Sequence, residues 1–244
     1  MWHEANPRGL WAANNPVPGM PRTPPPIPTP TVENYLKAIY ALSRGSGMAS
    51  MGALASELGV TPGTVTTMVR RLTQGGLARY EKYAGVGLTP AGKKAALSVV
   101  RRHRLIETFL VETLGLDWAE VHDEAERLEH ALSPTVIEAL DRFLGRPRVD
   151  PHGEPIPDAG GRIRERDLVP LAQVRSPTRF RVAQIADDSS AFLRFAGRHG
   201  LRPGARGTVR RVDRASDTLE IQVDGHAGVA VSFAVAGKIL ATIA

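Results

Sequence analysis

Apolar residues spaced three and four positions apart predict a series of helices between residues 31 and 74. The first helix, capped by Thr31, carries the apolar stripe Val32, Leu36, Ile39 and Tyr40 and ends at the glycines near residue 45. A short helix follows over residues 50–59. A third runs from Pro62 to Gln74 behind a Thr61 cap, and its inward positions are Val65, Met68, Val69 and Leu72.

The pattern between residues 77 and 144 predicts a hairpin and then three more helices. Residues 77–88 favour two short strands around a glycine turn. A long helix begins at Thr89-Pro90 and runs to about Leu114, and the next spans about Asp117 to Leu132 with the apolar face Trp118, Val121, Ala125, Leu128 and Leu132. The last follows a Ser133-Pro134 cap to about Leu144, and it offers a core or dimer face made of Val136, Ile137, Leu140, Phe143 and Leu144.

Most of the final hundred residues lack the helical spacing of the preceding segments. Residues 145–167 are rich in proline and glycine, which predicts an ordered loop or a linker. From Leu168 the residues favour short strands at 178–185, 206–212, 218–223, 228–233 and 238–243, with one helix at 189–199. Several short strands with one helix indicate a small SH3-like β-barrel, and the fold class is therefore α+β.

Composition adds limits to this outline. Prolines recur through residues 1–30, which predicts a disordered or polyproline II arm. The formal charge of +6 favours a polyanionic partner. The absence of cysteine excludes a disulfide framework, a thiolate zinc site and a cysteine nucleophile. No apolar run reaches membrane-spanning length and no signal pattern opens the chain, so we expect a soluble cytoplasmic protein with no membrane partner.

The helices at 50–59 and 62–74 are joined by a tight glycine-containing turn, which is the signature of a helix-turn-helix. Small hydroxyls near the start of the second helix can reach base edges and phosphates, and arginines suit phosphates or guanine. The hairpin at 77–88 would be a wing. The predicted DNA-binding residues are Thr61, Thr64, Thr66, Thr67, Arg70, Arg71 and Lys82.

A polar stripe lies beside the apolar face of the helix at 117–132. His122, Glu126, Glu129 and His130 stand at i, i+4, i+7 and i+8, which places them on neighbouring turns. Imidazoles and carboxylates in this arrangement suit a divalent first-row metal. The alternative is a solvated face with i,i+4 charge pairs, which is the usual role of such residues.

A second histidine and carboxylate favour the metal. His103 and Glu107 are also i and i+4, and apolar residues flank both at helical spacing. Both therefore point toward a core, where an unpaired carboxylate would be costly and a bound cation would compensate its charge.

With these residues in place, the chain from Val32 to about Pro157 resembles the diphtheria toxin repressor family of metal-activated transcription regulators. The barrel resembles that family more loosely. The resemblance is carried by Val32-Glu-Asn-Tyr-Leu36, the winged helix, Arg102-His-Arg-Leu105 with Glu107, Val121-His-Asp-Glu-Ala125, Glu129-His130 and His152-Gly-Glu-Pro-Ile-Pro157. It implies a homodimer that binds a palindromic double-stranded DNA operator when Mn(II) or Fe(II) is bound.

The resemblance also implies two metal sites. One consists of His103, Glu107 and His122, and the other of Glu126, Glu129 and His130 with Asn34 from the first helix. The barrel supplies ligands in this family, here Asp187 or Asp188. The iron branch has cysteine at the position of Glu126 and methionine at that of Asn34, so oxygen ligands here favour Mn(II) over Fe(II). The manganese branch has aspartate at the Asn34 position and glutamate at that of Lys37, which leaves the number of metals open.

The expected protein is a metal-activated regulator in four parts. A Pro-rich arm at 1–30 precedes a winged-helix DNA-binding domain at 31–95, a helical metal-binding and dimerisation domain at 96–157, and a linker with an SH3-like domain at 158–244. One rival is a winged-helix regulator that needs no metal. The other is a di-metal helical-bundle enzyme, which is disfavoured because the required Glu-x-x-His motif is absent.

Overall fold

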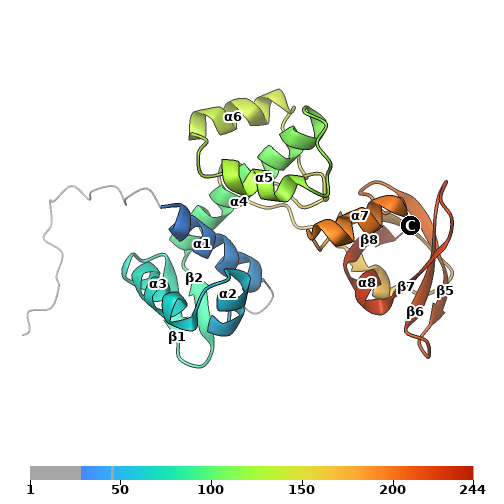
Figure 1. Ribbon diagram of the computed structural model, residues 1–244, viewed down its shortest axis with the longest axis horizontal. Coiled ribbons are helices and arrows are strands. Elements are labelled where there is room, and N and C mark those ends of the chain that lie inside the picture. Colours follow the sequence, from blue (N-terminus) through green and yellow to red (C-terminus); the bar gives the residue numbers. More distant parts are fainter. Residues whose placement is uncertain (1–28, 45–46, 244) are drawn as a thin grey trace, which may run out of the picture.

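The computed structural model describes residues 29–44 and 47–243, so the predicted arm at 1–30 lies almost wholly outside the described residues. Three bodies follow one another along the chain (Figure 1): α1–α3 with a small hairpin, then α4–α6, then a sheet with two helices. The α+β fold predicted from the sequence, with a winged helix, a helical body and a C-terminal sheet, is confirmed. Within the described residues, no helix is long and apolar enough to cross a membrane.

The first body is a winged helix-turn-helix. It comprises α1 (Pro30–Leu42), α2 (Met51–Glu57), α3 (Pro62–Gln74), β1 (Ala78–Glu81) and β2 (Gly85–Leu88). The Thr61 side chain caps α3 as predicted, because it accepts a hydrogen bond from the Thr64 amide at 3.3 Å. The predicted Thr31 cap is wrong: Thr29 caps α1 through the Val32 amide at 3.4 Å, since Pro30 fits the first helical position.

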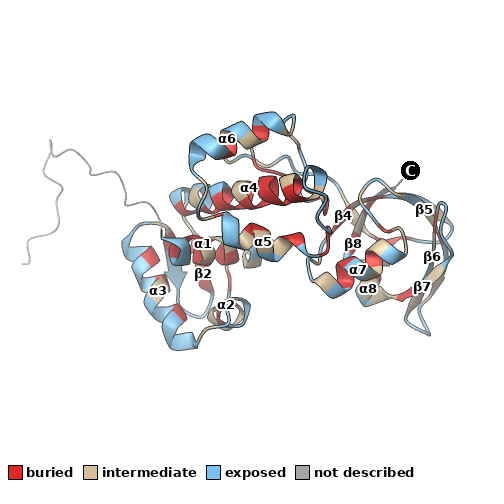
Figure 2. Ribbon diagram, turned by 45° about the horizontal axis from the view of Figure 1, so that its top comes forward, coloured by how far each residue is buried: buried red, intermediate tan, exposed pale blue. Residues whose placement is uncertain are grey.

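The long helix α4 (Pro90–Glu112) forms the centre of the second body. Figure 2 shows it as a largely buried rod, and it packs against α1, α5 (Val121–Leu128) and α6 (Pro134–Phe143). The helix predicted over 117–132 is therefore too long. Trp118 lies ahead of α5 and packs into the core of the third body under the guanidinium of Arg202, so it does not continue the α5 face.

The third body is an antiparallel sheet in the order β3-β8-β4-β5-β6-β7. Its strands match the predicted ranges closely and are followed or interrupted by two short helices. Their bounds are β3 Val169–Pro170, β4 Thr178–Ile185, α7 Ser190–Arg198, β5 Arg206–Asp213, β6 Thr218–Val223, β7 Val229–Ser232, α8 Phe233–Gly237 and β8 Ile239–Ile243. The elements β3 and α8 were not predicted.

The proline-rich loop after α6 joins the second body to the third. Arg104 of α4 donates to the Pro155 carbonyl at 2.6 Å, and the Ile185 amide of β4 donates to the His152 carbonyl at 2.8 Å. Gly153 has a φ of 85°, and a Cβ there would overlap the carbonyl of Ala183 in β4. Only glycine allows this close approach, so the segment is an ordered loop that fixes β4 against α4.

Candidate metal centre

The centre is built on one face of α4, where His103 and Glu107 lie one turn apart. Both are buried, with 7% and 2% of their surface exposed. The Nε2 atom of His103 lies 2.9 Å from Oε1 of Glu107. The prediction that this pair points into the core is confirmed. Such burial is tolerable only where the charges are compensated.

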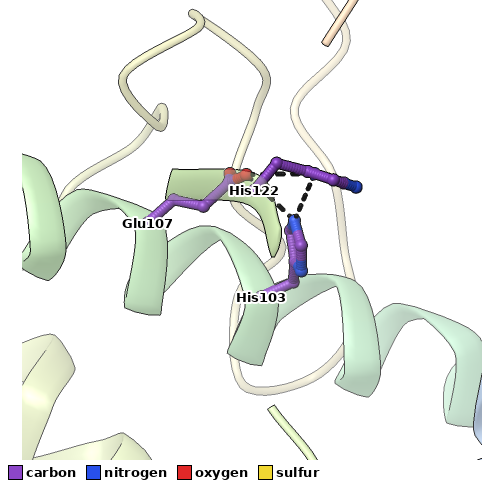
Figure 3. Close-up of side chains that lie close together, drawn as sticks. All are labelled: His103, Glu107 and His122. Carbon is purple, nitrogen blue, oxygen red and sulfur yellow. Dashed lines mark hydrogen bonds and ion pairs between the residues drawn. The ribbon is translucent and has the colours of Figure 1, made fainter. Parts of the chain in front are cut away.

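His122, in the first turn of α5, completes the group (Figure 3). Its Nδ1 atom lies 3.2 Å from Nε2 of His103 and 3.4 Å from Oε1 of Glu107. Two imidazole nitrogens and a carboxylate oxygen thus converge on one point from two helices. This donor set fits a divalent first-row metal.

Residues after β4 approach the same point from the third body. The Oδ2 atom of Asp188 lies 3.8 Å from Nδ1 of His122, whereas Asp187 forms an ion pair with Lys238. Both residues line the cavity at the cluster, but of the two only Asp188 has a carboxylate paired with His122. Its side chain is 69% exposed, so it can move toward a ligand without breaking other contacts.

Charges within the cluster shift its proton affinities. Burial disfavours the charged ring of His103, but the carboxylates of Glu107 and Glu129 outweigh it and raise the pKa of His103 to about 9. The hydrogen bond to Glu107 likewise raises the pKa of His122. Burial opposes ionisation of Glu107, yet the His103 charge and hydrogen bond hold the pKa of Glu107 well below its usual range. The ring of His103 therefore carries a proton that a metal would have to displace.

The second predicted ligand set, Asn34 with Glu126, Glu129 and His130, is arranged differently. The helix α5 ends at Leu128, so Glu129 is its C-cap and the predicted continuous stripe is broken. Glu129 turns inward, is fully buried, and accepts from His103 Nδ1 at 2.7 Å. His130 pairs with Glu33 of α1, with Nδ1 2.7 Å from Oε2, while its Nε2 lies 3.4 Å from Oε1 of Glu129.

Lys37 of α1 reaches into this second set. Its Nζ atom lies 3.0 and 3.1 Å from the two oxygens of Glu129 and also bonds Oε1 of Glu126. Among the described residues, the buried Oδ1 atom of Asn34 has no hydrogen-bond partner, and the buried Nε2 atom of His130 lies 3.4 Å from Oε1 of Glu129 without a hydrogen bond. The set therefore contains metal donors and an ammonium group together.

Two residues beside the centre were not predicted to belong to it. Glu33 joins His130 to Arg102, whose Nη2 lies 2.6 Å from Oε2. The second residue is His152, in the proline-rich loop after α6. It is 4% exposed, donates from Nε2 to the Trp118 carbonyl at 2.7 Å, and lies 3.9 Å from Glu107 through Nδ1. The i,i+3 spacing of Glu33 and Leu36 in the first helix was the available signal that Glu33 faces inward. No helical spacing gave such a signal for His152.

The predicted DNA-contacting residues gather on the exposed side of α3 and in the wing, and all seven are exposed. The hydroxyls of Thr66 and Thr67 donate to carbonyls one turn earlier, at 2.9 and 3.1 Å, while Thr61 and Thr64 share a hydrogen bond at 2.9 Å. These hydroxyl oxygens keep acceptor capacity. The Lys82 ammonium lies over the ring of Tyr83, 4.9 Å from its centre.

Three family models match the chain in succession. Residues 29–86 match "Iron dependent repressor, N-terminal DNA binding domain", residues 89–158 match "Iron dependent repressor, metal binding and dimerisation domain", and residues 169–242 match "FeoA domain". The matched segments coincide with the winged helix, the α4–α6 body and the sheet.

Characterised relatives and solved structures agree with the models. The chain is 39% identical over 114 residues to the HTH-type transcriptional regulator MntR of Lysinibacillus sphaericus, covering 47% of this chain and 81% of that protein. It is 39% identical over 127 residues to the iron-dependent repressor IdeR of Mycobacterium tuberculosis, covering 52% and 55%. The structure "Manganese-dependent transcriptional repressor complex with manganese" is similar with a TM-score of 0.81 and 35% identity, over 87% of this chain and 100% of that one.

Proposed function

Because this chain belongs to the diphtheria toxin repressor family, we propose that it is a dimeric transcription regulator that binds operator DNA when Mn(II) is bound. Fe(II) is the alternative activator, as the name of IdeR indicates for that relative. The family consists of DNA-binding repressors, so the enzyme reading is set aside. We place its action on DNA in the cytoplasm.

The observation that carries the proposal is the convergence of His103, Glu107 and His122 within 3.4 Å, with the first two residues buried. A surface stripe of charges would not bury Glu107 to 2% exposure. These three residues would hold the ion, with Asp188 close enough to join them. A divalent ion would supply the positive charge that the proton on the His103 ring supplies without it.

A chain of hydrogen bonds connects this site to the DNA-binding body. While His103 faces Glu107 through Nε2, its Nδ1 faces Glu129 at 2.7 Å. A carboxylate on the second ring nitrogen fixes the tautomer and orientation of a metal-binding histidine. Glu129 in turn bonds Lys37 of α1 at 3.0 Å. His103 therefore couples metal uptake to the position of α1.

The position of α1 matters because the winged helix is built around it. Leu36 and Ile39 are fully buried in a core shared with Val65 and Leu72 of α3. A shift of α1 against α4 therefore moves α3 with it. In a homodimer, such a shift sets the distance between two recognition helices, which must match one turn of DNA to reach successive major grooves.

The choice of Mn(II) follows from the donor atoms. Imidazole and carboxylate ligands without sulfur suit Mn(II), which gains little from soft donors. Most sites bind Fe(II) more tightly than Mn(II). Selectivity for Mn(II) must therefore arise from the geometry of the site, or from Fe(II) activating DNA binding less well once it is bound. The domain boundaries at residues 30, 95 and 157 remain part of the proposal.

The test is selection of DNA sequences from a random pool by the full chain, with Mn(II) and with a chelator. We expect a palindromic sequence to be enriched with Mn(II) alone, and anaerobic Fe(II) to enrich it less strongly. Equal enrichment of one sequence in both conditions would establish the rival, a winged-helix regulator that needs no metal.

A further inference from the structure

We propose that the Lys37 ammonium is a resident cation at the second ligand set, so that each subunit takes up a single metal ion rather than two. The ion is the one at His103, Glu107 and His122, and the inference therefore rests on the proposed function. It concerns how many ions activate the protein and which part of the contact between α1 and α5 depends on metal.

The carboxylates of the second ligand set use the full hydrogen-bonding capacity of the Lys37 ammonium group. A lysine ammonium has three N–H donors. Within the described residues, the three hydrogen bonds of Lys37 all go to the set, two to the oxygens of Glu129 and one to Glu126. The Glu129 side chain is fully buried and that of Lys37 is 20% exposed, so water screens the interaction poorly.

A metal ion at the same carboxylates would lie within a few ångströms of this ammonium group. Repulsion between a dication and an ammonium in a poorly screened site opposes binding, and the ammonium cannot leave without losing all three hydrogen bonds. The first set has no such competitor. Among the described residues, the ion pairs of His103, Glu107 and His122 involve histidines and acids alone.

Apart from Lys37, the second set is chemically ready for a metal. Oδ1 of Asn34 and Nε2 of His130 are buried and make no hydrogen bond within the described residues, and the His130 nitrogen faces Oε1 of Glu129 at 3.4 Å. With the two carboxylates they form a nitrogen and oxygen donor set that suits Mn(II). The charge at position 37 is therefore the feature that decides between one ion and two.

This arrangement gives the two sets different roles. The Lys37 ion pairs tie α1 to the end of α5 whether or not metal is present. The first set is then the switchable one, and its state reaches Lys37 through His103 and Glu129. Activation by a single ion per subunit predicts a shallower response to metal concentration than activation by two coupled ions.

The experiment measures bound metal in the full chain by titration calorimetry with Mn(II) and by elemental analysis after desalting. We expect about one Mn(II) per subunit in the wild type and in Lys37→Arg, which keeps the charge, and about two in Lys37→Met, which removes it. Lys37→Gln serves the same purpose if Lys37→Met does not fold. Circular dichroism and size-exclusion chromatography check the fold of each variant.

Glu107→Gln identifies which set is filled. In the wild-type background it should abolish uptake, and in the Lys37→Met background it should leave one ion. Two ions in the wild type, or one in both charge-removing variants, would overturn the inference while leaving the proposed function standing. No bound metal in any variant would overturn the proposed function as well.

Discussion

Replacing Glu107 by glutamine tests the candidate metal centre with the smallest change in shape. The side chain is 2% exposed, its pKa is lowered by His103, and it is therefore ionised at neutral pH. At an effective dielectric constant of 20, a carboxylate and a dication attract each other by about 8 kcal/mol at 4 Å. The glutamine carbonyl oxygen retains part of this attraction, and we take half of it as the free energy of metal binding that the variant loses. About 4 kcal/mol corresponds to roughly a thousandfold weaker metal binding.

The metal-free protein should be affected far less. Glu107→Gln removes the charge-assisted hydrogen bond to His103, worth about 1.5–3 kcal/mol, and weakens the longer 3.4 Å contact with His122. The ring of His103 keeps its second partner, because Glu129 accepts from Nδ1 at 2.7 Å. The charged ring is therefore not left unpaired, and the variant should fold without metal.

Thermal unfolding with and without Mn(II) separates the two effects. At about 100 times the wild-type dissociation constant, metal stabilises the wild type by about 2.7 kcal/mol, and a thousandfold weaker site gains less than about 0.1 kcal/mol. The expected Tm shift is about 5–10 °C for the wild type and under about 1 °C for the variant. Glu124→Gln is the matched control, since Glu124 pairs with Arg127 on the exposed side of α5. A wild-type Tm shift in Glu107→Gln would refute the assignment of this site.

Three further predictions follow from separate parts of the chain. The pKa of His103 is raised to about 9, so a proton competes with the metal at neutral pH. The affinity for Mn(II) should therefore fall about tenfold for each pH unit below 9. A constant affinity between about pH 6.5 and 8.5, measured by competition with a chelator, would contradict this. Arg70→Ala should weaken operator binding and reduce its salt slope by about one, whereas Arg198→Ala on the exposed end of α7 should do neither, as measured by fluorescence anisotropy at several salt concentrations. Gly153→Ala and Gly115→Ala both place alanine at positive φ, but only the former clashes with β4, so it should lower the free energy of unfolding by at least about 1 kcal/mol more in urea titrations.

Local signals determined most of the fold. The bounds of α3 and β4 agree with the prediction because a Thr61 cap with Pro62 starts the helix and strand residues fill 178–185 without interruption. The end of α5 could not be predicted, because it depends on tertiary contacts. Glu129 turns toward His103 and Lys37, and Trp118 joins a core formed by residues far along the chain. The missed α8 and β3 have five and two residues, too few to show a period.

In the candidate site, too, local features could be predicted from the sequence, whereas contacts between distant segments could not. The i,i+4 spacing and apolar flanks of His103 and Glu107 were enough to place both toward the core. Their proximity to His122 was predicted from the family resemblance, because the spacing of residues within one helix does not show which residues of another helix pack against it. The sequence showed that Lys37 departs from the manganese branch, yet it could not show that the ammonium reaches Glu126 and Glu129 across two domains.

The acidic and basic side chains of the cluster already pair with one another, and this limits how strongly a metal can act on DNA binding. A charged His103 faces ionised Glu107 and Glu129, and Lys37 faces Glu129 from the other side. The same hydrogen bonds therefore hold α4, α5 and α1 together before any ion enters. Exchange of the His103 ring proton for a divalent ion would change the strength and direction of these contacts rather than create them. The coupling between metal and operator should accordingly lie within the ordinary range of about 1–3 kcal/mol, enough for a regulator that responds in proportion to its metal.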